Sequence, residues 1–266
     1  MKLKTRPAGL IFDLDGTLAD TLPQLALAAS QACEAAGLKA PTLEQAKSFV
    51  GNGVTLLLSR AIVGSRKIVA HTDPITLASL AKADVANISE KALSENVQVH
   101  EVTPEDIDPA LLREVRANFD KFYTATLHEN FTLYSGVKEG LSYFKQSGIK
   151  LAVCTNKPQM FALPLLKYMG ISQYFDFILG GEVLSRRKPD PSPVLYVCGR
   201  LGLYPWQCAM IGDSENDVFA AQNAQMSSVF LSYGYFTGDP ATINPDYEFD
   251  NFNDFMALIS NLKKDY

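Results

Sequence analysis

Near its N-terminus the chain reads Ala8-Gly9-Leu10-Ile11-Phe12-Asp13-Leu14-Asp15-Gly16-Thr17-Leu18. The first half of this stretch is a short apolar run, which is typical of a buried strand in a parallel sheet. Two aspartates follow where that strand ends, and open α/β sheets bind their ligands at such ends. Because side chains alternate in an extended segment, Asp13 and Asp15 point the same way and repel each other unless a cation or a proton intervenes. The alternative interpretation is a strand followed by a common Asp-Gly turn.

From residue 136 onwards, apolar strand-like runs alternate with amphipathic segments of helical spacing. This alternation predicts parallel βαβ units with right-handed crossovers, and therefore an α/β fold built on a doubly wound, Rossmann-like parallel sheet. The predicted strands are residues 8–12, 149–154, 175–179, 209–211 and 228–231. The predicted helices are residues 20–36, 137–146, 160–169, 193–201, 216–222 and 255–262.

Residues 41–129 follow a different pattern, since no run among them predicts a buried strand. Apolar residues recur there at roughly helical spacing, at positions 56–58, 77–80 and 111–122. Residues 94–109 are polar and include two prolines, which predicts an exposed loop. We therefore expect an inserted α-helical domain of residues 20–130 within a discontinuous core domain of residues 1–19 and 131–266.

Composition and charge narrow the class of protein. The 266 residues are 47% hydrophobic and 20% charged, which is ordinary globular usage and enough chain for one or two domains. The net charge of -5 gives no basic excess for DNA, RNA or an anionic membrane, and no apolar span is long enough for a transmembrane helix. The four cysteines form no C-x-x-C pair, which predicts buried free thiols in a soluble cytoplasmic protein.

Three more polar clusters follow predicted strands. Thr155 and Asn156 offer polar groups at a helix start that suit an anionic oxygen, or they simply cap that helix. Lys188 can neutralise a phosphate, or it belongs to a solvated basic loop. Asp213 and Asp217 supply hard oxygens that suit Mg²⁺, or they favour the dipole of a helix N-terminus. Each cluster alone is weak evidence for a binding site. Their shared position after successive strands makes the combination strong evidence for one.

The four motifs, in this order, resemble those of the haloacid dehalogenase-like superfamily of phosphohydrolases. The matching residues are Asp13-x-Asp15-Gly16-Thr17, Thr155-Asn156, Lys188-Pro189 and Gly212-Asp213-Ser214-x-x-Asp217. Within the superfamily the chain looks most like the phosphoglycolate phosphatases. That narrower likeness rests on Phe49-Val50-Gly51-Asn52-Gly53, Thr155-Asn156-Lys157-Pro158, Gly180-Gly181-Glu182 and Ser232-Tyr233-Gly234-Tyr235. The likeness thins out across residues 63–109, and the inserted helical domain resembles the superfamily's cap.

The resemblance implies a Mg²⁺-dependent phosphatase of small phosphate monoesters, with 2-phosphoglycolate as the first candidate substrate. It implies that Asp13 attacks phosphorus to form an aspartyl phosphate. Asp15 would protonate the leaving group and then deprotonate the attacking water. The implied Mg²⁺ ligands are Asp13, the backbone carbonyl of Asp15 and Asp213. Asp217 would act by orienting these ligands or would bind the ion through a water molecule. The implied phosphate-binding residues are Thr155, Asn156 and Lys188.

One loop of the cap is a candidate for substrate specificity. Gly51, Asn52 and Gly53 allow backbone N–H groups to approach a small anion, although a tight turn between helices fits as well. Arg60, about two helical turns later, either assists this loop or is a surface charge. The three histidines receive no role.

Related activities also fit the motifs. A sugar-phosphate mutase, a pyrophosphatase, a nucleotidase and a non-catalytic regulator that binds a phosphorylated metabolite all stay open. The chain has neither G-x-S-x-G nor G-x-x-x-x-G-K-[ST], which disfavours an α/β-hydrolase and a P-loop NTPase. We expect a monomer or homodimer whose partner is a small phosphorylated metabolite.

Overall fold

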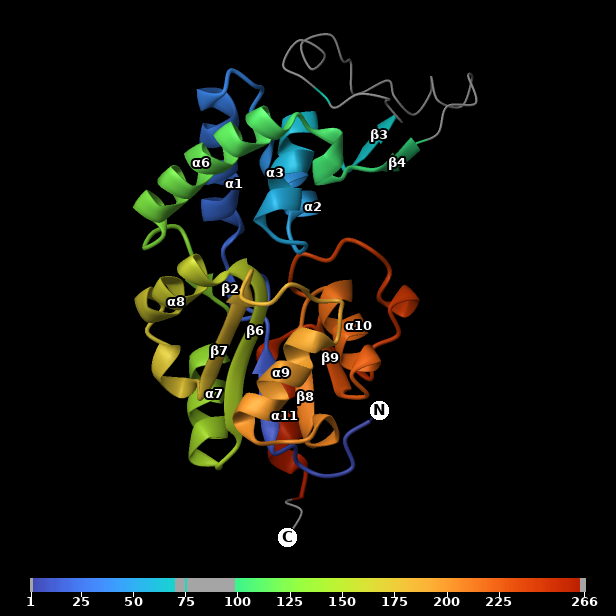
Figure 1. The fold of residues 1–266 in the computed structure, drawn as a ribbon. Coiled ribbons are helices and arrows are strands. Elements are labelled where there is room, and N and C mark those ends of the chain that lie inside the picture. The colour runs from blue at the N-terminus through green and yellow to red at the C-terminus, as the bar shows by residue number, and fades with distance from the viewer. Residues whose placement is uncertain (1, 70–74, 76–98, 264–266) are drawn as a thin grey trace. The chain divides into compact units, whose positions relative to one another are not determined.

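The computed structural model describes residues 2–69, 75 and 99–263. The chain forms two compact units (Figure 1): Met1–Thr21 with Asn130–Tyr266, and Leu22–Glu129. No helix in the described ranges is long and apolar enough to cross a membrane. The four cysteines are buried and free, as predicted.

The first unit is built on a six-stranded sheet with the order β10-β9-β8-β1-β6-β7. All neighbouring strands in it are parallel, which confirms the predicted α/β fold. The strands are β1 (Gly9–Phe12), β6 (Lys150–Pro158), β7 (Phe177–Gly181), β8 (Cys208–Gly212), β9 (Ser227–Leu231) and β10 (Tyr247–Phe249). Because β1 lies between β6 and β8, the strand order reverses at β1, which is where such sheets bind ligands.

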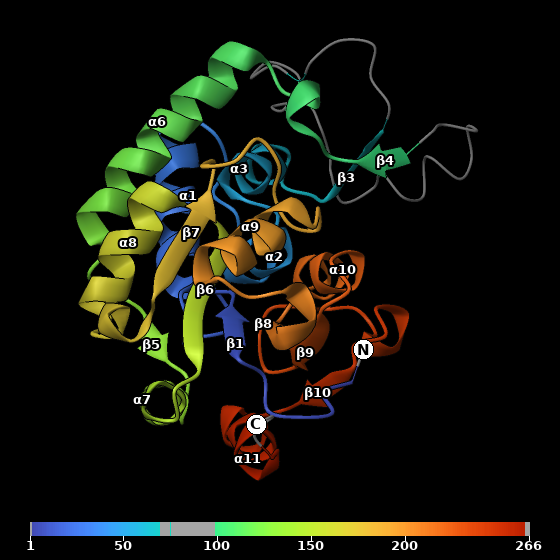
Figure 2. The same ribbon diagram turned by 60° about the horizontal axis from the view of Figure 1, so that its bottom comes forward.

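Helices cover both faces of this sheet (Figure 2), with α7 and α11 on one side of β1 and α9 and α10 on the other. Ile11 packs into the cluster formed with α9 and α10. Phe12 points the opposite way, and its ring lies 6.2 to 6.4 Å from three rings of α7 and α11, those of Phe144, Phe252 and Phe255. Strand β1 is apolar throughout because its alternating side chains enter two separate cores, one on each face of the sheet. The helices are α7 (Val137–Gln146), α8 (Gln159–Tyr168), α9 (Ser192–Leu201), α10 (Glu215–Asn223) and α11 (Phe252–Asn261).

Strand β6 differs from its prediction in a way that matters for the site. It continues to Pro158, and its register against β7 shifts between Cys154 and Pro158, as at a β-bulge. Thr155 and Asn156 therefore lie in the strand, and α8 begins only at Gln159, with Pro158 as its N-cap residue. The prediction that these two residues start or cap a helix was wrong.

The second unit is mainly helical, with α1 (Leu22–Ala35), α2 (Leu43–Phe49), α3 (Val54–Val63) and α6 (Pro109–Thr126). It also contains an antiparallel pair, β3 (Lys67–Val69) and β4 (Val99–Glu101), which sequence reasoning missed. The described part of the predicted loop at 94–109 is thus partly ordered structure, and Val102 and Ile107 in it are buried. The predicted positions 77–80 and His71 lie outside the described residues.

Both prolines in that segment begin helices. Pro104 opens a 3₁₀ turn (Pro104–Asp106), and Pro109 is the first residue of α6. Asp108 caps α6, since its Oδ1 accepts hydrogen bonds of 2.9 Å from the N–H groups of Ala110 and Leu111. Proline suits the first helical position because its missing N–H has no partner there in any case. The two prolines thus mark helix starts within the segment predicted to be an exposed loop.

Candidate active site

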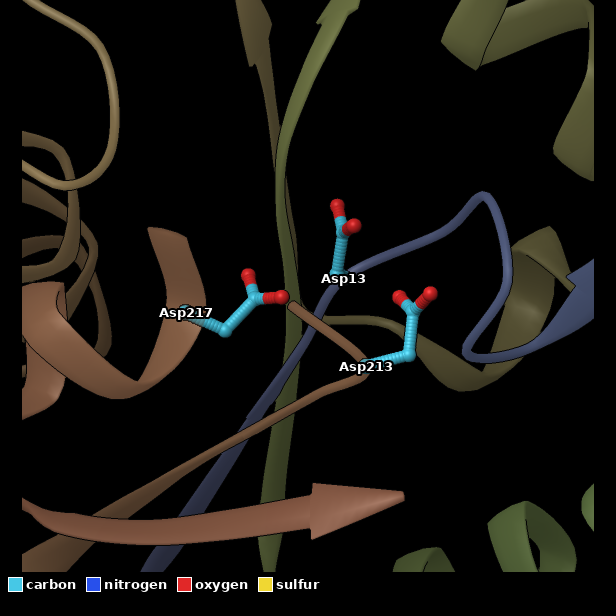
Figure 3. Close-up of side chains that lie close together, drawn as sticks. All are labelled: Asp13, Asp213 and Asp217. Carbon is cyan, nitrogen blue, oxygen red and sulfur yellow. The ribbon is translucent and has the colours of Figure 1, made fainter. Parts of the chain in front are cut away.

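Three carboxylates gather at the carboxyl edge of the sheet (Figure 3). Asp13 follows β1, Asp213 follows β8, and Asp217 lies in the first turn of α10, with oxygen atoms within 4.8 Å of one another. They meet because β1 and β8 are neighbours in register, with Phe12 opposite Ile211. Parallel strands end at the same edge, so residues about two hundred positions apart in the sequence become adjacent.

Because this cluster is buried, the ionised form of its carboxyl groups is disfavoured. Burial raises the pKa of Asp213 well above its ordinary value, and the nearby Asp217 and Asp13 raise it further. Hydrogen bonds to Asp213 from the Tyr235 N–H (2.8 Å) and the Thr17 hydroxyl (2.9 Å) oppose the increase in its pKa without cancelling it. Burial likewise raises the pKa of Asp217 to about 6. Close, buried carboxylates ionise together only when a cation joins them.

Lys188 supplies one positive charge to the cluster. Its Nζ lies 2.5 Å from Oδ1 of Asp217 and 3.1 Å from Oδ1 of Asp13. Burial acts to lower the pKa of Lys188, but the two carboxylates outweigh it and raise that pKa above its usual range. The alternative of a solvated basic loop is therefore wrong for Lys188, whose side chain is 2% exposed.

Asn156 holds the main chain of Lys188 in place. Its Nδ2 donates to the Lys188 carbonyl (3.0 Å), and its Oδ1 accepts from the Lys188 N–H (3.1 Å). The hydroxyl oxygen of Thr155 accepts a 3.2 Å hydrogen bond from the Lys157 N–H. The Thr155 hydroxyl keeps its own proton for donation to an anion, since its oxygen serves here as an acceptor.

Glycines leave room for the carboxylates. A Cβ on Gly16, which has a φ of +80°, would lie 2.2 Å from Oδ2 of Asp213. A Cβ on Gly212 would lie 2.1 Å from Cγ of Asp217. Any side chain at these positions would displace a member of the cluster, because real contacts of Cβ atoms are not that short.

The cluster fits a divalent cation. Oδ1 of Asp13 is buried and accepts no hydrogen bond of suitable geometry from the described residues, although Lys188 Nζ is near. Carboxylate oxygens are the ligands that Mg²⁺ prefers. Asp217 is less available, because Oδ1 already pairs with the Lys188 ammonium and Oδ2 accepts two bonds, from the Ser214 N–H and hydroxyl. Among the residues that the structure describes, each oxygen of Asp213 accepts a single bond, from the Thr17 hydroxyl or the Tyr235 N–H, and keeps a lone pair for an ion. Asp13 and Asp213 are therefore the carboxylates best placed to bind an ion directly.

The Asp15 side chain lies outside this carboxylate group and has a lysine of its own. Lys157 Nζ lies 3.0 and 3.1 Å from the two oxygens of Asp15. The Thr21 hydroxyl donates to Oδ1 of Asp15 at 2.6 Å. Sequence reasoning assigned Lys157 no role, because the predicted strand ended at residue 154 and so missed the extended backbone in which residues two apart share a face.

A second group that the sequence did not assign is the pair of tyrosines after β9. Tyr233 donates to the Thr17 carbonyl (2.7 Å), and Tyr235 donates to Asp20 (2.8 Å) and accepts from the Thr21 N–H (2.7 Å). These bonds fix the segment that follows Asp13 and Asp15. Part of it forms β2 (Ala19–Asp20), which pairs with β5 (Thr132–Leu133).

In the second unit, Arg60 is buried rather than a surface charge, with 4% of its side chain exposed. Its Nη1 lies 3.2 Å from both the Phe49 carbonyl and Oδ1 of Asn52. Gly51 and Gly53 have φ values of +114° and +90°, a backbone shape that favours glycine. Arg60 thus holds the predicted specificity loop in a defined shape.

Comparisons with known proteins agree with the motifs. The haloacid dehalogenase-like hydrolase family matches residues 7–225. A phosphoglycolate phosphatase of Photobacterium profundum is 38% identical over 251 residues, which is 94% of each chain. Another, from Colwellia psychrerythraea, is 33% identical and covers 97% of this chain and 99% of its own.

Solved structures agree as well. The crystal structure of a predicted phosphoglycolate phosphatase from Haemophilus somnus superimposes with a TM-score of 0.76 at 32% identity. The match covers 96% of this chain and 98% of that one. The resemblance read from the motifs is confirmed, and the chain belongs to the haloacid dehalogenase-like hydrolase family.

Proposed function

We propose that this hydrolase is a Mg²⁺-dependent phosphatase that cleaves 2-phosphoglycolate to glycolate and phosphate through an aspartyl phosphate. The reaction class rests on family membership, and the substrate rests on the names of relatives up to 38% identical. The observation that carries the chemistry is the position of Asp13, which shares one sheet edge with Asp213, Asp217 and Lys188.

Asp13 is the nucleophile in this mechanism. Its buried Oδ1 accepts no hydrogen bond of suitable geometry from the described residues, so a lone pair is available for attack on phosphorus. The new bond joins this carboxylate to phosphorus as the bond to the ester oxygen breaks. Asp15, two residues later, gives a proton to the departing alkoxide and then accepts one from the water that cleaves the intermediate.

Lys188, Thr155 and Asn156 bind the phosphoryl group. Lys188 offers a positive charge beside the nucleophile, and Thr155 offers a hydroxyl proton. Asn156 contributes by fixing the main chain of Lys188. Donors held in advance stabilise the charge that spreads over the phosphoryl oxygens in the transition state.

Asp13, Asp213 and the main-chain carbonyl of Asp15 would hold Mg²⁺, with Asp217 oriented by Lys188 behind them. When bound, the ion offsets the negative charge of the phosphoryl group and of the carboxylates. The raised pKa values of Asp213 and Asp217 support a requirement for such a cation.

We further propose that residues 20–130 form a cap that selects the substrate, within a core domain of residues 1–19 and 131–266. The loop Gly51-Asn52-Gly53 would present backbone N–H groups to the carboxylate of the substrate, and Arg60 would preserve the shape of the loop.

Phosphate release from a panel of esters, with Mg²⁺ and with EDTA, tests the proposal. The panel contains 2-phosphoglycolate, sugar phosphates, nucleotides and pyrophosphate. A preference for 2-phosphoglycolate that EDTA abolishes is the expected result. Broad Mg²⁺-dependent release would retain the phosphatase and reject the substrate. Isomerisation without release would favour a mutase, and binding without turnover would favour a regulator.

A further inference from the structure

Two buried lysines serve two different carboxylates at the same sheet edge. Lys188 lies beside Asp13, whereas Lys157 lies beside Asp15. The Lys157 side chain is 1% exposed, and the Asp15 side chain is 13% exposed. Burying an ammonium group costs free energy that one ion pair does not always return, so the pair is poorly explained by stability alone.

The contacts of Asp15 differ in kind. Thr21 donates to Oδ1 alone, so this hydrogen bond locates one of the two carboxyl oxygens. Lys157 Nζ lies at nearly equal distances, 3.0 and 3.1 Å, from both oxygens. Together with the Thr21 bond to one oxygen, a cation shared by both oxygens holds the position and the plane of the group.

We propose that Lys157 is a positioning residue that holds the Asp15 carboxyl group in the orientation from which it exchanges a proton with the ester oxygen and with water. The inference rests on the proposed function, in which Asp15 is the acid and base. Proton transfer requires the two heavy atoms to be within hydrogen-bond reach, so a carboxyl group free to rotate is in place for only part of the time.

The placement of Lys157 on the chain supports this role. Its N–H donates to the Thr155 hydroxyl oxygen, so its main chain is anchored to a residue of the phosphate-binding motif. Lys157 precedes Pro158, and the register of β6 against β7 shifts between Cys154 and Pro158. The irregular end of β6 therefore carries the side chain that reaches Asp15.

The test compares Lys157→Met with wild type on two substrates. Alkyl phosphates such as 2-phosphoglycolate need a proton on the leaving oxygen, whereas p-nitrophenyl phosphate departs without one. We expect kcat/KM, which reports the step that expels the leaving group, to fall by about 100-fold for the alkyl ester and by less than about 5-fold for p-nitrophenyl phosphate, with no rise in KM. Lys157→Arg, which can also donate to both oxygens, should recover part of the alkyl-ester activity.

Lys145→Met is the matched control. Lys145 also pairs with an aspartate, Asp176, at 2.5 Å, but at a site where both side chains are more than one-third exposed. This variant should leave both activities at the wild-type level. A loss there equal to that of Lys157→Met would mean that removing a lysine–aspartate pair acts through stability.

A second arm uses Asp15→Asn. Since Lys157 acts through Asp15, adding Lys157→Met to Asp15→Asn should reduce either activity by less than about 3-fold more. This comparison also tests the proposal if Lys157→Met alone does not fold, because the double variant removes both charges of the Lys157–Asp15 pair and leaves neither unpaired. A further large loss in the double variant, an equal loss on both esters, or a raised KM would overturn the proposal. If wild type releases phosphate from neither ester, the proposed function itself has failed.

Discussion

Two regions of the molecule each bury cations, and they use them differently. At the sheet edge of the first unit, Lys188 and Lys157 contact acidic side chains from segments far away in the sequence. In the second unit, Arg60 donates to the Phe49 carbonyl at the end of α2 and to Asn52 in the loop that follows. Its Nη2 also lies 3.5 Å from the half-exposed carboxylate of Glu101. The first region concentrates reactive charge, whereas the second stabilises the shape of a backbone. Substitutions in the two should therefore change different kinetic constants.

The largest effect tests the first region directly. Asp13→Asn keeps the size of the side chain but removes the carboxylate oxygen proposed as nucleophile, so phosphate release should fall by about 10⁴-fold or more. Steady-state turnover of 2-phosphoglycolate measures it, with circular dichroism as the check on folding. Retention of more than about a hundredth of the activity by a folded variant would remove Asp13 from its role.

A smaller loss should follow from Lys188→Met. Removing one preorganised donor from a phosphoryl site costs about 10² to 10³ in kcat, and Lys188, which lies beside Asp13, is the proposed donor. Arg186→Met serves as the control, since Arg186 lies two residues earlier and its side chain is 72% exposed. If the two substitutions lowered kcat equally, Lys188 would not be a specific donor to the phosphoryl group.

The second region should respond in KM. Gly51→Val places a branched side chain at a φ of +114°, which distorts the loop by strain of about 1–3 kcal/mol. We expect KM for 2-phosphoglycolate to rise about 10-fold while kcat stays within about 3-fold. Gly37→Val is the control, because Gly37 also has a positive φ of +72° but a Cβ there meets no atom within 4 Å. Unchanged kinetics in Gly51→Val would remove the loop from substrate recognition.

The smallest effect concerns pH and the ion. Burial raises the pKa of Asp213 and, to about 6, that of Asp217, so the folded state binds protons that the unfolded state has released. Without a cation, the free energy of unfolding therefore falls as pH rises through about 6. Saturating Mg²⁺ should offset this loss and raise Tm by about 5 °C at pH 7.5, but by less at pH 5. Equal shifts at both pH values, measured by calorimetry, would contradict the assignment of the ion to this cluster.

The sequence predicted those parts of the site that follow wholly apolar, buried strands. Asp13 and Asp213 could be placed because each ends a buried run, and parallel neighbours end at one edge. Lys157 could not be placed in this way, because the end of β6, where its register against β7 shifts, shows no alternation of apolar residues that would indicate a strand. The strands β3 and β4 were missed because three residues each are too few to show alternation.

The prediction for Arg60 also shows where sequence reasoning ends. Helical spacing places a residue on a face, but it does not say which main-chain carbonyl a guanidinium will meet. The choice between a surface charge and a buried one depended on the loop Gly51-Asn52-Gly53, whose shape comes from two positive φ angles. Such angles are permitted by glycine without being required by it.

The central place of β1 also bears on how the chain matures as it is synthesised. This strand is made first, yet its neighbours in the finished sheet, β6 and β8, follow after a long delay. The Thr17 hydroxyl and Asp213, hydrogen-bonded partners, are separated by 196 positions. A nascent chain thus carries Asp13, the proposed nucleophile, for most of translation before Asp213 and Asp217 are made. The carboxylate cluster therefore assembles only after β8 and the start of α10 have been made and have paired with a strand synthesised much earlier.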